Sequence, residues 1–185
     1  MTFEGKKEVT TLEGDKQFIS QGPVAAIVAI KQLGTNGGGF YGANAAHPLE
    51  NPTFLSNTVS CMSMLLLPMS FVFALGFYLK KKKFAFSVFT VMLVALIIGI
   101  AVTVSTERLG NPNISFMGID QSGGAMEGKE SRLGASATAL WSAITTATSN
   151  GSVNGMHDSM MPLSGLVTLF SMQVNSWFGG IGVGF

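Results

Sequence analysis

The chain has 185 residues, a length typical of one domain, but only 11% are charged, against about 25% in soluble globular proteins. The net charge of +1 gives no electrostatic reason to expect nucleic acid as a partner. No G-x-x-x-x-G-K-[ST] sequence is present, so we expect no direct nucleotide binding through a P-loop.

The first patterned element is residues 22–34, GPVAAIVAIKQLG, which is apolar and alanine-rich and predicts a short helix. Residues 35–39, TNGGG, follow it, and glycine permits backbone angles that other residues avoid. Such a helix is too short to cross a hydrocarbon core of about 30 Å and too apolar to lie in water. We therefore expect a re-entrant helix that enters the membrane part way and ends in a glycine loop.

Two long uncharged segments follow, at about 56–79 and about 84–105, and each has the roughly 20 apolar residues that a transmembrane helix needs. Only the four lysines Lys80–Lys83 separate them. The positive-inside rule places this turn in the cytoplasm, so the glycine loop lies on the extracytoplasmic side. The alternative, two buried helices of a soluble protein, would require a small core to hide both runs.

The remaining chain repeats the earlier pattern. An extracytoplasmic loop is expected at 106–132, followed by a second short helix at about 133–147 and a second polar loop at 148–153. A third, glycine-rich span is expected at about 160–185, where the sequence stops. The Asn-Gly pair at 36–37 recurs 114 positions later, and a repeat of this kind is typical of duplicated units in transport proteins.

The chemistry of the two loops favours a large monovalent cation. Neither loop contains a carboxylate, which calcium and magnesium sites normally recruit. The C-terminal end of each short helix carries partial negative charge, and backbone carbonyls can replace the hydration shell of a potassium ion. The candidate potassium ligands are Thr35, Asn36, Gly37, Gly38, Gly39, Thr148, Ser149, Asn150, Gly151 and Ser152.

Three other signals are weaker. Residues 37–42 satisfy G-x-G-x-x-G, but a dinucleotide site needs a strand before the motif and a helix after it. His47 and His157 could bind a metal, although hydrogen bonding at the mouth of each loop is the favoured interpretation. Glu50 and Asp158 follow the loops, and could either anchor them or concentrate cations at the entrance.

Four stretches of this sequence resemble the potassium-binding A subunits of Kdp-type potassium-transporting ATPases. They are GPVAAIVAIKQLGTNGGGFYGANAAHPLENPTFLSN (22–57), MEGKESRLG (126–134), TTATSNGSVNGMHDS (145–159) and FGGIGVG (178–184). The resemblance implies an all-α membrane protein with potassium-channel-like repeats of pore helix, filter loop and transmembrane helix. Residues 1–79 would form part of a second repeat and residues 84–185 a truncated third one.

The resemblance also implies a non-catalytic subunit of a bacterial or archaeal plasma-membrane complex. Its partners would be membrane lipid, a separate P-type catalytic subunit that hydrolyses ATP, and small accessory subunits. Only two of four filter loops would be present, so an orphan fragment that binds nothing is the alternative interpretation.

Overall fold

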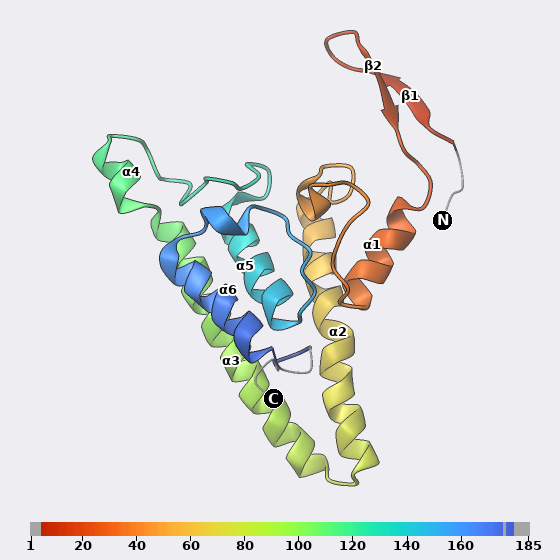
Figure 1. Cartoon of the computed structure of the whole chain (residues 1–185), viewed down its shortest axis with the longest axis vertical. Helices are drawn as coiled ribbons and strands as arrows, with labels where there is room; N and C mark the ends of the chain where they lie inside the picture. The colour runs from red at the N-terminus through yellow and green to blue at the C-terminus, as the bar shows by residue number, and fades with distance from the viewer. Residues whose placement is uncertain (1–4, 176, 180–185) are drawn as a thin grey trace.

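The structure is a computed structural model that describes residues 5–175 and 177–179. Helices dominate it (Figure 1), as the all-α expectation requires. The elements are β1 (Lys7–Thr10), β2 (Lys16–Ile19), α1 (Val24–Leu33), η1 (Asn44–Ala46), α2 (Phe54–Tyr78), α3 (Lys82–Leu109), α4 (Pro112–Phe116), α5 (Gly134–Ala147), η2 (His157–Ser159) and α6 (Pro162–Val174).

Helices α2 and α3 form a long antiparallel hairpin whose lysine turn lies at the lower end of Figure 1. Both are long and apolar enough to cross a membrane, with lengths of about 38 and 42 Å at 1.5 Å per residue. Only 22% and 11% of their most apolar windows are buried, whereas a core helix of a soluble protein is mostly buried. Next to the turn the helices touch, because a Cβ atom on Gly76 would lie 2.3 Å from the Cβ of Ala85.

Most hydroxyl groups on this hairpin are satisfied within their own helices. Each of eight donates to the carbonyl four residues earlier, at 2.6–3.1 Å, which leaves these groups no need for water. This is the arrangement that a hydrocarbon environment demands of polar side chains. The eight residues are Thr58, Ser63, Ser70, Ser87, Thr90, Thr103, Ser105 and Thr106.

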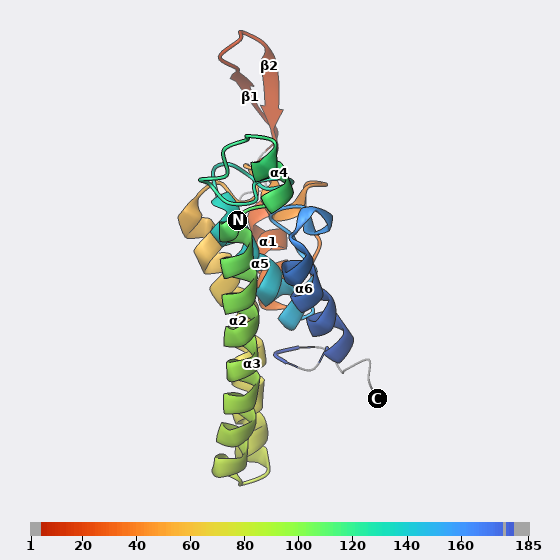
Figure 2. The ribbon, with the colours of Figure 1, turned by 90° about the vertical axis from the view of Figure 1, so that its left-hand side faces the viewer.

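The two short helices α1 and α5 end near the middle of the hairpin (Figure 1), so their C-terminal ends lie at half its height. Helix α5 packs against α2, α3 and α6, and Trp141 at its centre is fully buried. Helix α1 packs against α2, and Ile30 on its outer side is 65% exposed. Figure 2 shows the same arrangement edge-on, with α5 and α6 to one side of α3.

The third span expected at about 160–185 is wrong in extent. Helix α6 has thirteen residues, about 20 Å, which is too short to cross a membrane. It ends at Asn175, whose left-handed conformation (φ 42°, ψ 40°) stops the helix. The backbone N–H of Phe178 then donates to the carbonyl of Ala147 at 3.3 Å, which returns the chain to the end of α5. Of the expected glycine-rich end, 180–185 lie outside the described residues.

Two further features were not expected. Strands β1 and β2 pair antiparallel in a small exposed hairpin, with Glu8 and Lys16 forming an ion pair at 2.7 Å. Helix α3 continues to Leu109, past the expected end at residue 105, and the charge of Glu107 in its last turn is buried in an ion pair with Lys129 at 3.0 Å. Part of the expected loop 106–132 is therefore helical, and the short helix α4 follows.

Candidate cation-binding loops

The two loops leave their helices with the same backbone hydrogen bonds. The first loop is defined as residues 35–39 and the second loop as residues 148–152. In the first, the N–H of Asn36 donates to the carbonyl of Lys31 at 3.2 Å. The N–H of Asn150 donates to the carbonyl of Thr145 at 2.9 Å, and both residues lie 114 positions later. The sequence repeat is thus also a repeat of local structure.

Backbone dihedral angles repeat as well. Thr35 and Ser149, which are equivalent, have φ values of 51° and 58°. Gly37 and Gly151, also equivalent, have φ values of 71° and 81°. Residues with a Cβ atom avoid this left-handed region, so Thr35 and Ser149 are held there by their surroundings and the two glycines permit the turn that follows.

The two loops lie against each other. A Cβ atom on Gly37 would be only 1.9 Å from the carbonyl oxygen of Asn150, so glycine is required for this approach. The side-chain amide of Asn150 donates to the Lys31 carbonyl at 3.1 Å and to Gln32 Oε1 at 3.1 Å. Ser152 Oγ donates to the same Gln32 oxygen at 3.3 Å. Residues about 118 positions apart are therefore joined into one polar site.

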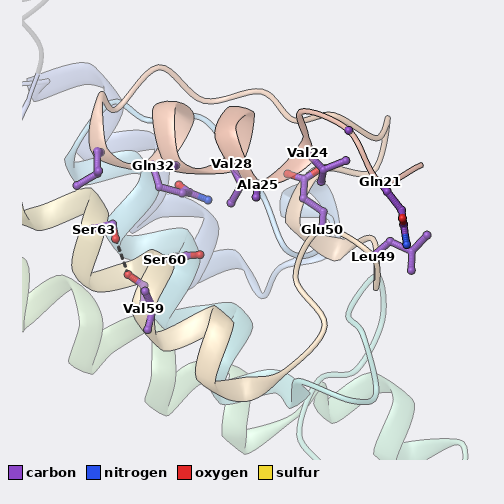
Figure 3. A pocket seen from close by; sticks show the side chains of 13 residues that line it. Gln21, Val24, Ala25, Val28, Gln32, Leu49, Glu50, Val59, Ser60 and Ser63 are labelled. Atoms are coloured by element: carbon purple, nitrogen blue, oxygen red, sulfur yellow. Dashed lines mark hydrogen bonds between the residues drawn. The ribbon is translucent and has the colours of Figure 1, made fainter. Parts of the chain in front are cut away.

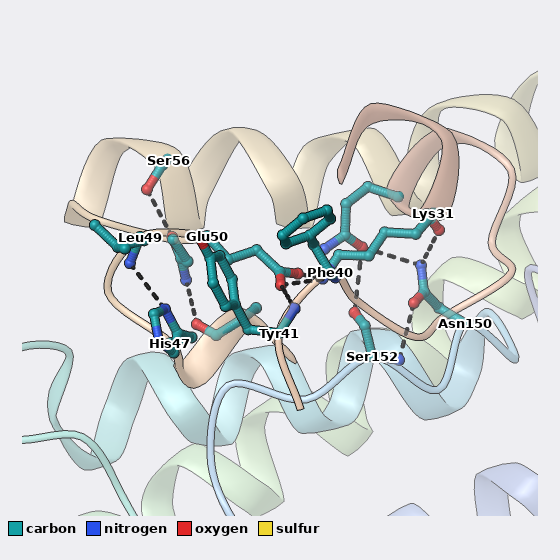
Figure 4. A network of polar contacts seen from close by, with 12 residues as sticks. Lys31, Phe40, Tyr41, His47, Leu49, Glu50, Ser56, Asn150 and Ser152 are labelled. Atoms are coloured by element: carbon teal, nitrogen blue, oxygen red, sulfur yellow. Dashed lines mark hydrogen bonds and ion pairs between the residues drawn. The ribbon is translucent and has the colours of Figure 1, made fainter. Parts of the chain in front are cut away.

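A buried ion pair joins the helix before the first loop to the chain after it (Figure 4). Lys31 Nζ pairs with Glu50 Oε1, and their side chains are 3% and 0% exposed. The other carboxylate oxygen of Glu50 accepts the N–H groups of Phe40 and Tyr41 at 3.1 and 3.2 Å. Of the two roles considered for Glu50, the contacts support anchoring of the chain that leaves the loop.

Neutral hydrogen bonds support the second loop instead. Trp141 Nε1 donates to the carbonyl of Ser152 at 2.8 Å, and the hydroxyl of Thr145 donates to the same oxygen at 2.7 Å. Thr145 is equivalent to Lys31 in the repeat. The carbonyl of Ser152 therefore faces helix α5, and of the ten candidate residues this one has its carbonyl already occupied.

The backbone carbonyls of the other nine candidate residues differ from that of Ser152 in their hydrogen bonding. No hydrogen bond joins any residue in 5–175 or 177–179 to the carbonyl oxygens of 35–39 or of 148–151. Thr148 and Asn150 are buried, where a carbonyl without a donor is uncommon, and it can accept a cation or water. The exposed residues of the set are Asn36, Gly38, Gly39, Ser149 and Gly151, whose carbonyls are open to solvent. Nine of the ten predicted positions thus have a backbone oxygen with no hydrogen-bond donor among the described residues, and those of Asn150 and Thr148 pack against Gly37 and Gly179.

A second polar network joins residues 46–57 to Arg132 and Asn154. Arg132 donates Nη2 to the carbonyl of Ala46 at 2.7 Å and Nη1 to the carbonyl of Asn51. The amide of Asn51 donates to Asn57 Oδ1 at 3.0 Å, and the amide of Asn154 donates to the same oxygen at 2.9 Å. These contacts fix the segment before α5, the start of α2 and the exit of the second loop to one another.

The histidines do not gather with other metal ligands. In the described part of the chain, no three His, Cys, Asp or Glu side chains lie close enough to hold a metal ion. His47 Nδ1 accepts the N–H of Leu49 at 3.2 Å, and its ring stacks on Tyr41 at 3.9 Å. Burial lowers the pKa of His157 below its usual value, which favours a neutral ring at pH 7.

A family model described as potassium-transporting ATPase A subunit matches residues 1–185. The chain belongs to this family. Proteins named potassium-transporting ATPase potassium-binding subunit are 64% identical in Bacteroides thetaiotaomicron over 184 residues, 64% in Parabacteroides distasonis over 185, and 49% in Pseudomonas syringae pv. tomato over 178. The alignments cover 100%, 100% and 96% of this chain, and 32%, 32% and 31% of the relatives. The chain thus spans about a third of the length of the curated relatives that it matches.

Family membership and the two long apolar helices together show an all-α membrane protein of the A-subunit family. The sequence indicated both loops and Glu50 as a candidate anchor, but it did not indicate the other side chains that hold the loops. These side chains are Lys31, Gln32 and Trp141, which lie on the two short helices, whose sequences are mainly apolar. The one available signal was Lys31, a charge within an apolar segment, because such a residue normally has a buried partner.

Proposed function

We propose that this chain forms the part of an A subunit in which two filter loops bind dehydrated potassium from the extracytoplasmic side. One observation carries the proposal: the two loops are repeats that lie side by side, with free carbonyl oxygens at 35–39 and 148–151. Carbonyl dipoles without fixed charge suit a large monovalent cation. The negative ends of α1 and α5 add to the attraction, since both helices end beside the loops.

In this proposal the ten candidate residues differ in role. Gly37 and Gly151 permit the backbone to turn its carbonyls toward the ion, and Thr35 and Ser149 add hydroxyl oxygens. Ser152 contributes through its contact with Gln32 rather than through its carbonyl. The remaining candidates, Asn36, Gly38, Gly39, Thr148 and Asn150, supply backbone oxygens.

The wider context is also a proposal. The subunit would lie in the plasma membrane of a bacterium or archaeon, with Lys80–Lys83 in the cytoplasm and the loops outside. It would be non-catalytic and would pass potassium to a P-type catalytic subunit that hydrolyses ATP, with small accessory subunits and lipid as further partners. The names of the relatives, which describe a potassium-binding subunit of an ATPase, support this assignment. The alternative is an orphan fragment with an incomplete filter.

The test substitutes glycines in the full-length subunit within its transport complex. Gly37→Ala and Gly151→Ala each force alanine into a left-handed conformation, which costs about 1–2 kcal/mol and corresponds to roughly a tenfold rise in the half-saturating potassium concentration. Gly37→Ala should be the more severe, because its Cβ would also meet Asn150, whereas nothing lies within 4 Å at Gly151.

Gly22→Ala is the matched control, since nothing lies within 4 Å of its Cβ position and its φ is not left-handed. It should leave the half-saturating concentration unchanged. Unaltered potassium affinity in both loop variants would refute the filter assignment. The orphan alternative would be favoured if stop codons separated this sequence from the DNA that encodes the missing repeats.

A further inference from the structure

Gln32 joins the two loops although it belongs to neither. It is the last residue but one of α1, and its side chain is almost completely buried. Its Oε1 accepts the amide of Asn150 at 3.1 Å and the hydroxyl of Ser152 at 3.3 Å, so the second loop is bound to the helix that leads into the first. Asn150 Oδ1 in turn accepts the N–H of Ser152 at 3.0 Å, which makes the second loop rigid at this point.

The nitrogen of the Gln32 side-chain amide makes no comparable contact within the described part of the chain. Gln32 Nε2 is buried and has no hydrogen-bond partner among the described residues. Gln32 lines a cavity of about 620 Å³ between α1 and α2, whose lining also includes Val28 and Ser60 (Figure 3). A buried amide nitrogen without an acceptor is destabilising, because no hydrogen bond replaces the ones it would make with water. Methionine would fill the same volume without this cost, so the side-chain oxygen is the part of Gln32 that the arrangement uses.

We propose that Gln32 is a positioning residue: by accepting hydrogen bonds from the second loop, it fixes the spacing between the two loops and thereby sets discrimination among alkali cations. The inference rests on the proposed function, because it presumes that a cation lies between the loops. Selectivity among ions of equal charge depends on where the oxygen ligands are held. A bridge between the loops therefore affects selectivity more than the rate of transport.

The test uses the full-length subunit in its complex and measures uptake of potassium and of rubidium separately. Gln32→Met keeps the length of the side chain and removes the acceptor. We expect the KM for potassium to rise at least about three- to tenfold, the value for one lost hydrogen bond, because the substitution removes the acceptor of two. The potassium-to-rubidium ratio of kcat/KM should fall at least about threefold, while kcat stays within about twofold. A purely structural role would lower the yield of complex or reduce uptake of both ions equally.

Ser63→Ala is the matched control. Ser63 lines the same cavity, but its hydroxyl donates only to the carbonyl of Val59 in its own helix, at 2.8 Å (Figure 3). It should leave both KM values and the ratio unchanged. If Gln32→Met fails to assemble, Ser152→Ala removes one of the two donors and should lower the ratio in the same direction by a smaller factor.

A double-variant cycle completes the test. In an Asn150→Ala background the main donor to Gln32 is absent, so Gln32→Met should have less than half of its effect on the ratio. Equal shifts for both ions, or additive effects of the two substitutions, would overturn the positioning role. That failure is distinguishable from failure of the filter assignment, in which the substitutions of Gly37 and Gly151 would themselves leave potassium affinity unchanged.

Discussion

Replacing Lys31 with methionine should destabilise the subunit more than neutralising Lys31 and Glu50 together. The two side chains are 3% and 0% exposed, so removal of the ammonium leaves a carboxylate buried without its cation. Breaking a buried pair in this way costs about 3–5 kcal/mol. In the double variant Lys31→Met/Glu50→Gln, the glutamine oxygen still accepts the N–H groups of Phe40 and Tyr41, and no charge remains buried. Its cost should be about 1–2 kcal/mol.

A charge swap provides the control for simple charge pairing. Lys31→Glu/Glu50→Lys restores one positive and one negative charge, but lysine has no acceptor for the N–H groups of Phe40 and Tyr41. The swap should therefore fail to restore stability. If it restored stability fully, the pair would act through charge alone, and the anchoring role of Glu50 would be wrong.

The assay is thermal denaturation of the purified full-length complex, and the quantity measured is the fraction of the subunit that remains assembled. The expected order of melting temperature is wild type, then the neutral double variant, then the swap and Lys31→Met. Half-saturating potassium should follow the reverse order, because the first loop loses its support as the pair is broken. A double variant that is less stable than Lys31→Met would refute the reasoning, since the two substitutions would then simply add.

Three further predictions concern the surroundings of the loops. Burial lowers the pKa of His157, so this side chain is protonated in the unfolded state at a higher pH than in the folded state. The free energy of unfolding should therefore decline as pH falls below about 6.5, and His157→Gln should flatten this part of the pH–stability profile. Arg132→Lys should lower the melting temperature and leave cation selectivity unchanged, because an ammonium lacks the fork that reaches the carbonyls of Ala46 and Asn51 together. Trp141→Phe removes one donor to the Ser152 carbonyl and should cost about 1 kcal/mol of stability, measured by thermal denaturation; no change would mean that Thr145 alone satisfies this oxygen.

The loops themselves could be identified from sequence because they depend on local residue chemistry. Left-handed turns recruit glycine and asparagine, so the Asn-Gly pairs at 36–37 and 150–151 stand out in an otherwise apolar chain. The spans α2 and α3 were equally accessible, since their composition follows from the thickness of the hydrocarbon core. These features need no knowledge of tertiary contacts.

The parts that sequence did not reveal depend on contacts between distant segments. The bridge from Asn150 to Gln32 joins residues 118 positions apart, and nothing in either local sequence specifies it. The end of α6 at Asn175 was missed because apolar residues continue on both sides of it. Composition predicts whether a segment is apolar, but the left-handed residue that stops a helix is decided by packing.

The different supports of the two loops follow from a few differences between equivalent positions. At one position the first unit has Lys31 and the second has Thr145, and at another they have Gly38 and Ser152. A lysine side chain is long enough to reach Glu50 and to leave the first loop's carbonyls without donors. The shorter hydroxyl side chain of Thr145 instead donates to the carbonyl of Ser152, at 2.7 Å. The two loops therefore share one backbone pattern but differ in the number of carbonyl oxygens without a hydrogen-bond donor. A cation between them would meet such oxygens at 35–39 in the first loop and at 148–151 in the second.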